Sequence, residues 1–294
     1  FALTARPSQC PPDGDWRTWL VMGGRGSGKT RTGAEWARLA ALFGGCRHIA
    51  LIAPTMHDAR EVMLNGKSGL CAISRPGEAV NWRETLRCAG CGLVARWRAC
   101  LHLFESIGMP AQNVAIYLTE RIGIFFEAMR ARHGNVCGSE FHAGRASGET
   151  MDLLGRPVRN EDVTRLSFAT AEFQHVICQD VLEHVPDYRA ALREFARVLS
   201  PGGSLYLSIP FTYTQHTLVR AEPEGRGGIV HHQTPMYHGD PMSSQGVLCY
   251  QDFGAELLDV LSEAGFVKCS IACVQDPAWA YIGGDVFFLA SKPA

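Results

Sequence analysis

The sequence predicts an α/β protein in which a doubly wound, mainly parallel sheet follows a shorter strand–loop–helix–strand (βαβ) unit. Three observations predict this arrangement. Apolar runs of strand length alternate with helical periodicity after about residue 113. A glycine-rich loop at residues 23–28 stands between a short apolar run and a helix-forming segment. The aperiodic stretch 65–77, which contains glycines and a proline, separates the two parts.

The first unit contains the elements of one βαβ crossover. Residues 16–22 are expected to form a buried strand, residues 29–43 a helix, and residues 48–53 a second strand. Gly44 and Gly45 follow the helix as a carboxyl-terminal cap would. The unit therefore has the strand, loop and helix order that a phosphate-binding loop requires.

The second part alternates strands and helices. The helix at residues 188–199 has the most regular apolar stripe, and the Pro-Gly-Gly sequence at 201–203 is expected to end it. Residues 212–250 are rich in Gly, His, Pro and Tyr and are expected to form a long excursion from the sheet. The expected strands are 114–118, 135–141, 163–168, 175–179, 204–209, 267–274 and 286–290, and the other expected helices are 120–132 and 252–264.

Charge is unevenly distributed along the chain, although the net charge is only −1. Residues 1–112 carry 14 Lys and Arg against 8 Asp and Glu, a balance of +6, whereas residues 113–294 carry 14 against 21, a balance of −7. Binding to nucleic acid is therefore expected only through the basic amino-terminal part. A fluctuation of surface charge is the alternative explanation for the acidic part.

The 11 cysteines are scattered, and their spacing is not that of a disulfide scaffold. Residues 1–6 lack the apolar core of a secretory segment. No stretch approaches the roughly 18 apolar residues that a membrane span needs. The sequence therefore predicts a cytoplasmic protein with reduced thiols and no membrane span.

The glycine-rich loop fits the P-loop (Walker A) pattern, with Gly23, Gly28, Lys29 and Thr30 at the required spacing. Glycines let backbone N–H groups surround a phosphate, the lysine brings a positive charge to it, and the threonine hydroxyl can hold Mg²⁺. These four residues are the candidate phosphate site, with ATP and Mg²⁺ as its candidate ligands. A glycine-rich turn with an incidental lysine is the alternative.

The residues around this loop resemble the start of a phage-type terminase large subunit, a DNA-packaging ATPase. The resemblance is carried by Asp15–Leu20, Arg31–Trp36 and Asp58–Met63. It covers residues 5–70 and implies a truncated P-loop unit at residues 1–70. A terminase also needs a second acidic strand to hold Mg²⁺ and orient water, and the sequence after residue 70 lacks one in the right context. ATP hydrolysis by this segment is therefore not expected.

Acidic residues stand at the ends of strands in the second part. Glu140 ends one expected strand, Asp162 precedes Val163 at another, and the central strand 176–180 finishes with Asp180. In a doubly wound sheet a ligand lies across the carboxyl ends of the strands. These side chains are therefore candidates to hold a ligand there.

From Trp82 onward the chain is similar to class I (type 11) S-adenosylmethionine (SAM)-dependent methyltransferases, which have a Rossmann-like sheet. The block 180–203 is the most specific part, and the resemblance covers residues 71–294. It implies a methyltransferase domain at residues 113–294, SAM as the cofactor, and methyl transfer to an unidentified small-molecule or macromolecular acceptor. The whole chain then reads as a chimera, either a natural fusion or a misjoined reading frame.

The resemblance also implies roles for particular residues. Glu140 would accept the ribose hydroxyls of SAM, and Asp162 would meet the adenine amino group. The candidate cofactor-binding residues are Glu120, Glu140, Asp162, Val163, Asp180, Val181 and Leu182, and the candidate catalytic residues are His184, Asp187, Tyr237 and His238. A loop cap is the alternative role for His184, and a polar loop is the alternative for Tyr237 and His238.

One departure from the methyltransferase pattern is the first glycine-rich turn. The corresponding segment, Tyr117–Gly123, retains a single glycine. Side chains in place of glycine would hinder the approach of backbone to the methionine part of SAM. Two rival interpretations therefore stay open: a non-catalytic protein with the SAM-binding fold, and a terminase-derived ATP-binding or DNA-packaging protein.

Between the two parts, residues 71–112 are expected to form a knuckle-like and helical lead-in. Cys88 and Cys91 form a CxxC pair, and Cys71 lies upstream. A structural zinc site needs four ligands, commonly from two such pairs. Cys71, Cys88 and Cys91 are therefore candidate zinc ligands, and reduced thiols in a turn are the alternative.

Overall fold

The computed structural model describes residues 29–42, 62–63, 82–107, 113–225, 227–240, 243–276 and 279–294. Contacts between residues divide the chain into one unit of residues 1–86 with 276–283, and a second of residues 87–275 with 284–294. The glycine loop and the strands expected at 16–22 and 48–53 lie outside the described residues.

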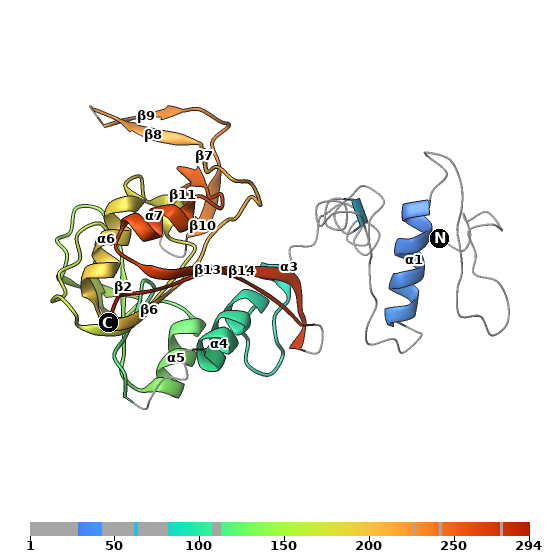
Figure 1. Ribbon diagram of the computed structural model, residues 1–294, viewed down its shortest axis with the longest axis horizontal. Helices are drawn as coiled ribbons and strands as arrows, with labels where there is room; N and C mark the ends of the chain where they lie inside the picture. Colours follow the sequence, from blue (N-terminus) through green and yellow to red (C-terminus); the bar gives the residue numbers. More distant parts are fainter. Residues whose placement is uncertain are drawn as a thin grey trace. The chain divides into compact units, whose positions relative to one another are not determined.

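Helix α1 (Lys29–Leu42) is the longest element described in the first unit (Figure 1). It begins at the lysine of the glycine loop, as the sequence predicts. Arg31 pairs with Glu35 one turn later, with 2.6 Å between Nη2 and Oε1. Thr32 and Glu35 are buried on the same helix. Helix α3 (Trp82–Thr85) is a further short element of this unit.

The second unit contains an eight-stranded sheet in the order β13-β14-β6-β5-β1-β2-β4-β3. The pairs β1–β2, β1–β5, β2–β4 and β5–β6 are parallel, and β14–β6 and β3–β4 are antiparallel. The strands of this sheet are β1 (Ile116–Leu118), β2 (Val136–Glu140), β3 (Thr150–Leu153), β4 (Arg156–Asn160), β5 (Phe173–Gln179), β6 (Leu199–Ser208), β13 (Val267–Asp276) and β14 (Tyr281–Ser291).

The strand order confirms the predicted doubly wound α/β fold. From β1 the chain proceeds outward through β2 and β4, and then returns to β5 on the other side of β1 and continues through β6 and β14. The order therefore reverses between β1 and β5. Such a switch point is where open α/β sheets bind their ligands, beyond the carboxyl ends of the strands.

Helices cover both faces of this sheet (Figure 1). On one face, Phe104 of α4 packs edge-on against His175 of β5 and Tyr206 of β6, with ring centroids 5.1 and 5.2 Å apart. On the other face, α6 and α7 pack on alternate residues of the same strands, including Val176 and Leu205. The helices are α4 (Ala95–Ile107), α5 (Ile124–His133), α6 (Tyr188–Val198), α7 (Leu257–Glu263) and the 3-10 turn η3 (Leu182–His184).

The predicted apolar stripe of α6 is confirmed. Its side chains Ala191, Leu192, Phe195 and Val198 are all completely buried. The helix begins at the cap residue Asp187, whose carboxylate accepts a hydrogen bond from the Ala190 N–H at 2.9 Å. It ends at Val198, and strand β6 starts at the next residue. Residues 201–203 therefore belong to the strand and are not the helix stop that the sequence predicted.

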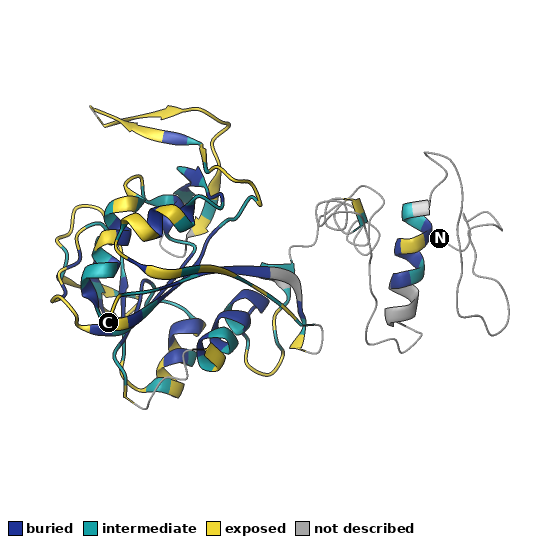
Figure 2. Cartoon of the chain, in the orientation of Figure 1, coloured by how far each residue is buried: buried dark blue, intermediate teal, exposed yellow. Residues whose placement is uncertain are grey.

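The long excursion between β6 and α7 forms three small two-stranded pairings, β12–β7, β8–β9 and β10–β11. The β8–β9 hairpin projects from the unit, and nearly all of its residues are exposed (Figure 2). The strands are β7 (Leu218–Val219), β8 (Ala221–Glu224), β9 (Gly228–His231), β10 (Tyr237–Asp240), β11 (Ser243–Leu248) and β12 (Gln251–Asp252).

The strand predicted at residues 163–168 was wrong. The third outward strand is β4, which pairs with β3 through a tight turn at Leu154 and Gly155, both with positive φ (54° and 74°). After β4 the chain turns at Asp162, whose carbonyl accepts the Arg165 N–H at 2.8 Å. The apolar residues at 163–168 reach the core from this irregular segment, so burial and not strand pairing explains their pattern. Helix α7 is also shorter than the predicted 252–264.

No helix in the part of the chain that the structure describes has both the length and the apolar character to cross a membrane.

Replacing Gly138 with alanine is expected to destabilise the second unit. A Cβ atom there would lie 2.5 Å from the Phe126 ring and 2.7 Å from the carbonyl oxygen of Glu120. Because the carbonyl belongs to the backbone, the loop after β1 must move, and overpacking of this kind costs about 1–3 kcal/mol. Urea denaturation should show the loss in the unfolding midpoint. The matched control is Gly225→Ala, where an added Cβ meets nothing within 4 Å; equal midpoints for both variants would contradict the prediction.

Candidate active site

The carboxyl ends of four parallel strands bring acidic side chains to one edge of the sheet. Glu120 follows β1, Glu140 ends β2, Asp162 follows β4 and Asp180 follows β5. The register aligns these ends, because Leu118 pairs with Ile177, and Glu140 pairs with Asn160. The structure therefore brings the predicted acidic residues to the same edge, at the switch point.

Glu120 lies just after β1, near the charged residues Arg96, Glu140 and Asp180. Its Oε1 is buried and makes no hydrogen bond to the residues that the structure describes. Burial raises the pKa of this carboxyl to about 8, against the opposing effect of the Arg96 charge; Glu140 and Asp180 raise it further. A buried carboxyl without a donor is costly, so this site suits a ligand that brings a positive charge or an N–H group.

Glu140 closes the loop that follows β1. Its Oε1 accepts hydrogen bonds from the backbone N–H groups of Arg121 at 2.8 Å and Ile122 at 2.7 Å. Gly123, with φ of 149°, then begins α5. The carboxylate therefore holds a turn that has lost most of its glycines, and one of its two oxygens is already engaged by the chain.

Arg96 of α4 covers the carboxyl end of β5. Its Nε lies 3.1 Å from Asp180 Oδ2, and its Nη1 donates to Gln179 Oε1 at 3.1 Å. Asp180 is held from the other side by the Ser208 hydroxyl at 3.2 Å. Arg96 is only 9% exposed, so this cation is placed in the site with little water around it.

Arg96 was not predicted from the sequence. A signal for it exists, because the arginine stands among apolar residues that are buried on one helix: Ala95, Ala99, Cys100, Leu101 and Phe104. A cation within such an apolar pattern indicates a buried charge partner.

The remaining cofactor candidates are placed less directly. Asp162 Oδ1 accepts hydrogen bonds from Thr164, from the backbone N–H at 2.9 Å and from the hydroxyl at 2.7 Å. The side chains of Val163 and Leu182 lie in the apolar core, and Val181 packs against it. These three residues therefore present mainly backbone atoms to a ligand at the sheet edge.

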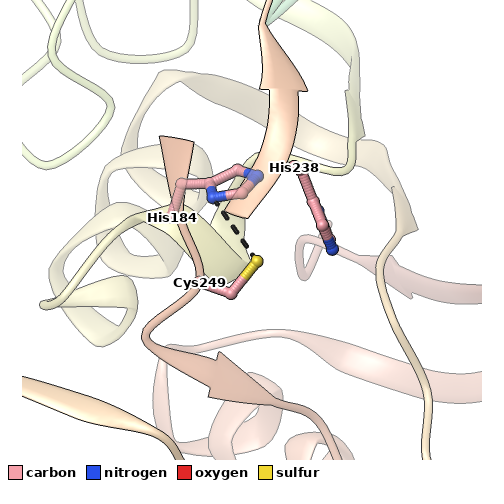
Figure 3. Close-up of side chains that lie close together, drawn as sticks. All are labelled: His184, His238 and Cys249. Atoms are coloured by element: carbon pink, nitrogen blue, oxygen red, sulfur yellow. Dashed lines mark hydrogen bonds between the residues drawn. The ribbon is translucent and has the colours of Figure 1, made fainter. Parts of the chain in front are cut away.

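Two of the four catalytic candidates come together with a residue that the sequence did not indicate. His184 of η3 and His238 of β10 have ring centroids 5.0 Å apart, and Cys249 lies beside both (Figure 3). The ligand-forming atoms of the three side chains all lie within 4.8 Å of one another. Asp187 instead caps α6, and Tyr237 is 57% exposed.

The charges in this cluster support one another. The neighbouring Cys249 thiol and Glu183 carboxylate raise the pKa of His238 to about 10. The pKa of His184 is also raised; burial alone would lower it, but Cys249 and Glu183 outweigh that effect. Burial would raise the pKa of Cys249, yet the two histidines lower it. The group therefore favours a thiolate beside imidazolium rings.

Cys88 and Cys91 lie in a tight turn before α4. The Gly92 N–H donates to the Cys88 carbonyl at 2.9 Å, and the Cys88 N–H donates to the Leu93 carbonyl at 2.9 Å. The N–H groups of Cys91 and Gly90 lower the pKa of the Cys88 thiol. This turn presents two of the three candidate zinc ligands, and Cys71 lies outside the described residues.

Two family models match the chain. A methyltransferase domain model matches residues 122–207, and a model of the amino-terminal part of T4likevirus-type terminase large subunits matches residues 20–88. Both resemblances are thereby confirmed. The methyltransferase match covers part of the expected range 71–294, and the terminase match continues past residue 70, its expected end, to residue 88.

Curated relatives match over short stretches. A ubiquinone biosynthesis O-methyltransferase of Xanthomonas oryzae pv. oryzae is 54% identical over 39 residues, 13% of this chain and 16% of that protein. One of the same name from Pseudomonas aeruginosa is 33% identical over 91 residues, 29% of this chain and 39% of the relative. For that of Nitrosomonas europaea the values are 29% over 112 residues, 36% and 48%. The chain thus spans less than half the length of these relatives.

Solved structures with similar folds include an S-adenosylmethionine dependent methyltransferase from Mesorhizobium loti, with a TM-score of 0.45 and 18% identity over 69% of this chain and 100% of that one. Another is the 1,6-didemethyltoxoflavin-N1-methyltransferase of Burkholderia thailandensis, with a TM-score of 0.42 and 17% identity over 68% and 79% of the two chains. The fold assignment rests on the strand order described above.

Proposed function

We propose that the second unit binds SAM at the switch point and transfers its methyl group to an acceptor. The observation that carries the proposal is the pair of groups at this point: the Glu120 carboxyl after β1, whose buried Oε1 makes no hydrogen bond to the described residues, and the buried guanidinium of Arg96 over β5. The amino-acid end of SAM carries an ammonium and a carboxylate. Glu120 would accept the ammonium, and Arg96 would meet the carboxylate in place of, or together with, Asp180.

The other strand ends suit the nucleoside. Glu140 and Asp162 stand at the ends of the adjacent strands β2 and β4, next to each other at the sheet edge. Glu140 would contact a ribose hydroxyl and Asp162 the adenine amino group. Both carboxylates already hold backbone of their own loops, which fixes their orientation before a ligand arrives.

SAM supplies an electrophilic methyl group on a sulfonium when it is bound. The chain then has to orient that group, exclude water and accommodate the acceptor. The methyltransferase domain model supports this activity, and the curated relatives are named as O-methyltransferases, so a hydroxyl acceptor is the first class to test. His184 and His238 are the candidates for taking the proton of such a hydroxyl.

A second candidate function, nucleotide binding by the first unit, is supported by the terminase model match over residues 20–88 and by α1, which begins at Lys29. Gly23, Gly28, Lys29 and Thr30 would then hold phosphate and Mg²⁺. Besides SAM and a nucleotide, the chain would bind a structural zinc ion through Cys71, Cys88 and Cys91.

Calorimetry with S-adenosylhomocysteine (SAH), 5′-methylthioadenosine and ATP tests these proposals. SAH is expected to bind, and methylthioadenosine, which lacks the amino-acid end, is expected to bind at least about tenfold more weakly because it contacts neither Glu120 nor Arg96. Folded protein that binds neither adenosyl ligand would contradict the methyltransferase proposal. ATP binding without SAH binding would favour the second candidate function.

A further inference from the structure

The most unusual polar group outside the switch point is the carboxylate of Glu183. Its side chain is completely buried, and neither oxygen makes a hydrogen bond within the described part of the chain. Its Oε1 points at the two rings of the cluster, 3.3 Å from His238 Nδ1 and 3.7 Å from His184 Nε2. A fully buried carboxylate is costly unless something compensates its charge.

These spacings match the coordination shell of a metal ion. Zinc binds nitrogen and oxygen ligands at about 2.0–2.2 Å, so neighbouring ligand atoms of a tetrahedral site lie roughly 3.4 Å apart. The Glu183–His238 and Glu183–His184 distances bracket that value at 3.3 and 3.7 Å. Cys249 lies beside both rings: the ligand-forming atoms of Cys249, His184 and His238 lie within 4.8 Å of one another, and Cys249 Sγ is 3.9 Å from His184 Nδ1.

Hydrogen bonds around the cluster orient its side chains. The Leu248 carbonyl lies 2.9 Å from His184 Nδ1, which fixes the proton on that nitrogen and leaves Nε2 to face Glu183. The Tyr250 N–H donates to the Glu183 carbonyl at 2.7 Å, and the Cys249 N–H donates to the Met236 carbonyl at 2.8 Å. The turn η3 and the β10–β11 hairpin are therefore already aligned in the protein without a bound ion.

The geometry points to a structural zinc site formed by Glu183, His184, His238 and Cys249, which fastens the β10–β11 hairpin to the turn after β5. Two imidazoles and one thiolate, with the Glu183 carboxylate as the fourth ligand, would fill all four positions of a tetrahedral zinc ion and leave none open for a substrate, as a structural site requires. The thiolate and the carboxylate neutralise the charge of the dication. With zinc bound the two histidines are ligands, so the proton-accepting role proposed for them above is open only to the zinc-free protein, and metal binding is measured without methyl transfer.

Cobalt binding tests this site, because a cobalt–thiolate bond has a charge-transfer band and four-coordinate cobalt has intense visible bands. The experiment uses the full chain carrying Cys88→Ser and Cys91→Ser, stripped of metal and titrated with Co²⁺ and then Zn²⁺. One Co²⁺ is expected to bind with both spectral features, and Zn²⁺ is expected to displace it. Cys249→Ser should remove the charge-transfer band, and His238→Asn should weaken Co²⁺ binding by more than about tenfold.

Matched controls are Cys269→Ser and His231→Asn, which change the same residue types outside the cluster and should leave the cobalt spectrum unchanged. Limited proteolysis provides a second measurement that does not need the variants to fold: Zn²⁺ should slow cleavage of the segment 235–250. The proposal is overturned if the background protein shows no thiolate band, if Cys249→Ser and His238→Asn both leave the spectrum intact, or if Zn²⁺ does not protect the segment.

Discussion

Arg96→Ala is expected to weaken SAH binding by about 30-fold or more, the largest effect on ligand affinity that the site predicts. The substitution removes the cation that would meet the ligand's carboxylate. Truncating one partner of a buried, hydrogen-bonded charge pair costs about 2 kcal/mol or more, and 2 kcal/mol is roughly 30-fold in Kd. Arg96→Lys should recover only part of the affinity, because lysine cannot contact Asp180 and Gln179 at the same time.

Arg96→Ala should also destabilise the free protein, since Asp180 loses its charge partner. The double variant Arg96→Ala with Asp180→Asn separates the two effects. It removes the uncompensated carboxylate, so the unfolding midpoint should recover while SAH affinity stays low. Arg193→Ala on the exposed face of α6 is the matched control and should change neither quantity. Full SAH affinity in a folded Arg96→Ala protein would show that this cation does not take part in binding.

The sequence predicted the sheet well where burial and strand pairing coincide. Strands β5 and β6 are largely buried on both faces where they pair, because helices cover both, and the short apolar runs at residues 176–178 and 205–207 therefore marked them. It failed at β4, whose residues Arg156–Asn160 are mostly polar. That strand lies near the edge of the sheet, and its pairing with β3 depends on the positive φ angles of Leu154 and Gly155. A Leu-Gly turn is a weaker hairpin signal than Asn-Gly or Asp-Gly.

The acidic residues of the candidate site were predicted from the sequence, but Arg96 was not. Glu140 ends β2 and Asp180 follows β5 directly, so chain order alone brought these two to one edge. Asp162 was expected before a strand at 163–168, and it reaches the same edge because it follows β4 instead. Arg96 lies on a helix before the sheet, and its contact with Asp180 crosses 84 positions of sequence, from 96 to 180. Local periodicity carries no information about such a contact.

The histidine–cysteine cluster shows the same limit. His184 and His238 were each predicted as catalytic candidates, but nothing in their spacing indicated that they meet. They meet because the Glu183 carbonyl and the Tyr250 N–H tie the end of the excursion to η3. Cys249 precedes Tyr250 and Glu183 precedes His184 in the chain, so this hydrogen bond also brings Cys249 and Glu183 beside the two rings.

Glu120→Gln is expected to stabilise the free protein at alkaline pH and to have little effect near pH 4.5. The folded-state pKa of Glu120 is about 8, against an ordinary value of 4.5. The unfolded chain therefore loses this proton near pH 4.5, whereas the folded chain keeps it until about pH 8. Stability of the unsubstituted protein falls through this window, because the unfolded state is the one that ionises. The variant avoids that loss, which is about 5 kcal/mol at pH 9, since each pKa unit between the ordinary 4.5 and the folded value of about 8 corresponds to about 1.4 kcal/mol. Thermal unfolding across this pH range measures the difference.

Bound SAH should favour the ionised form of Glu120 over the protonated form, and this change provides the sharper test of the proposed orientation of SAM. At pH 7 the Glu120 carboxyl of the free protein is protonated, and an ammonium placed against it favours the charged form. Binding of SAH is therefore expected to release close to one proton. Calorimetry in buffers of different ionisation enthalpy measures that proton, and the Glu120→Gln protein should release none and bind more weakly. Because methylthioadenosine lacks the ammonium, it should release no proton even from the unsubstituted protein. An SAH binding enthalpy that is identical in all buffers would mean that the ligand's amino group lies elsewhere, and the orientation proposed for SAM would then be wrong.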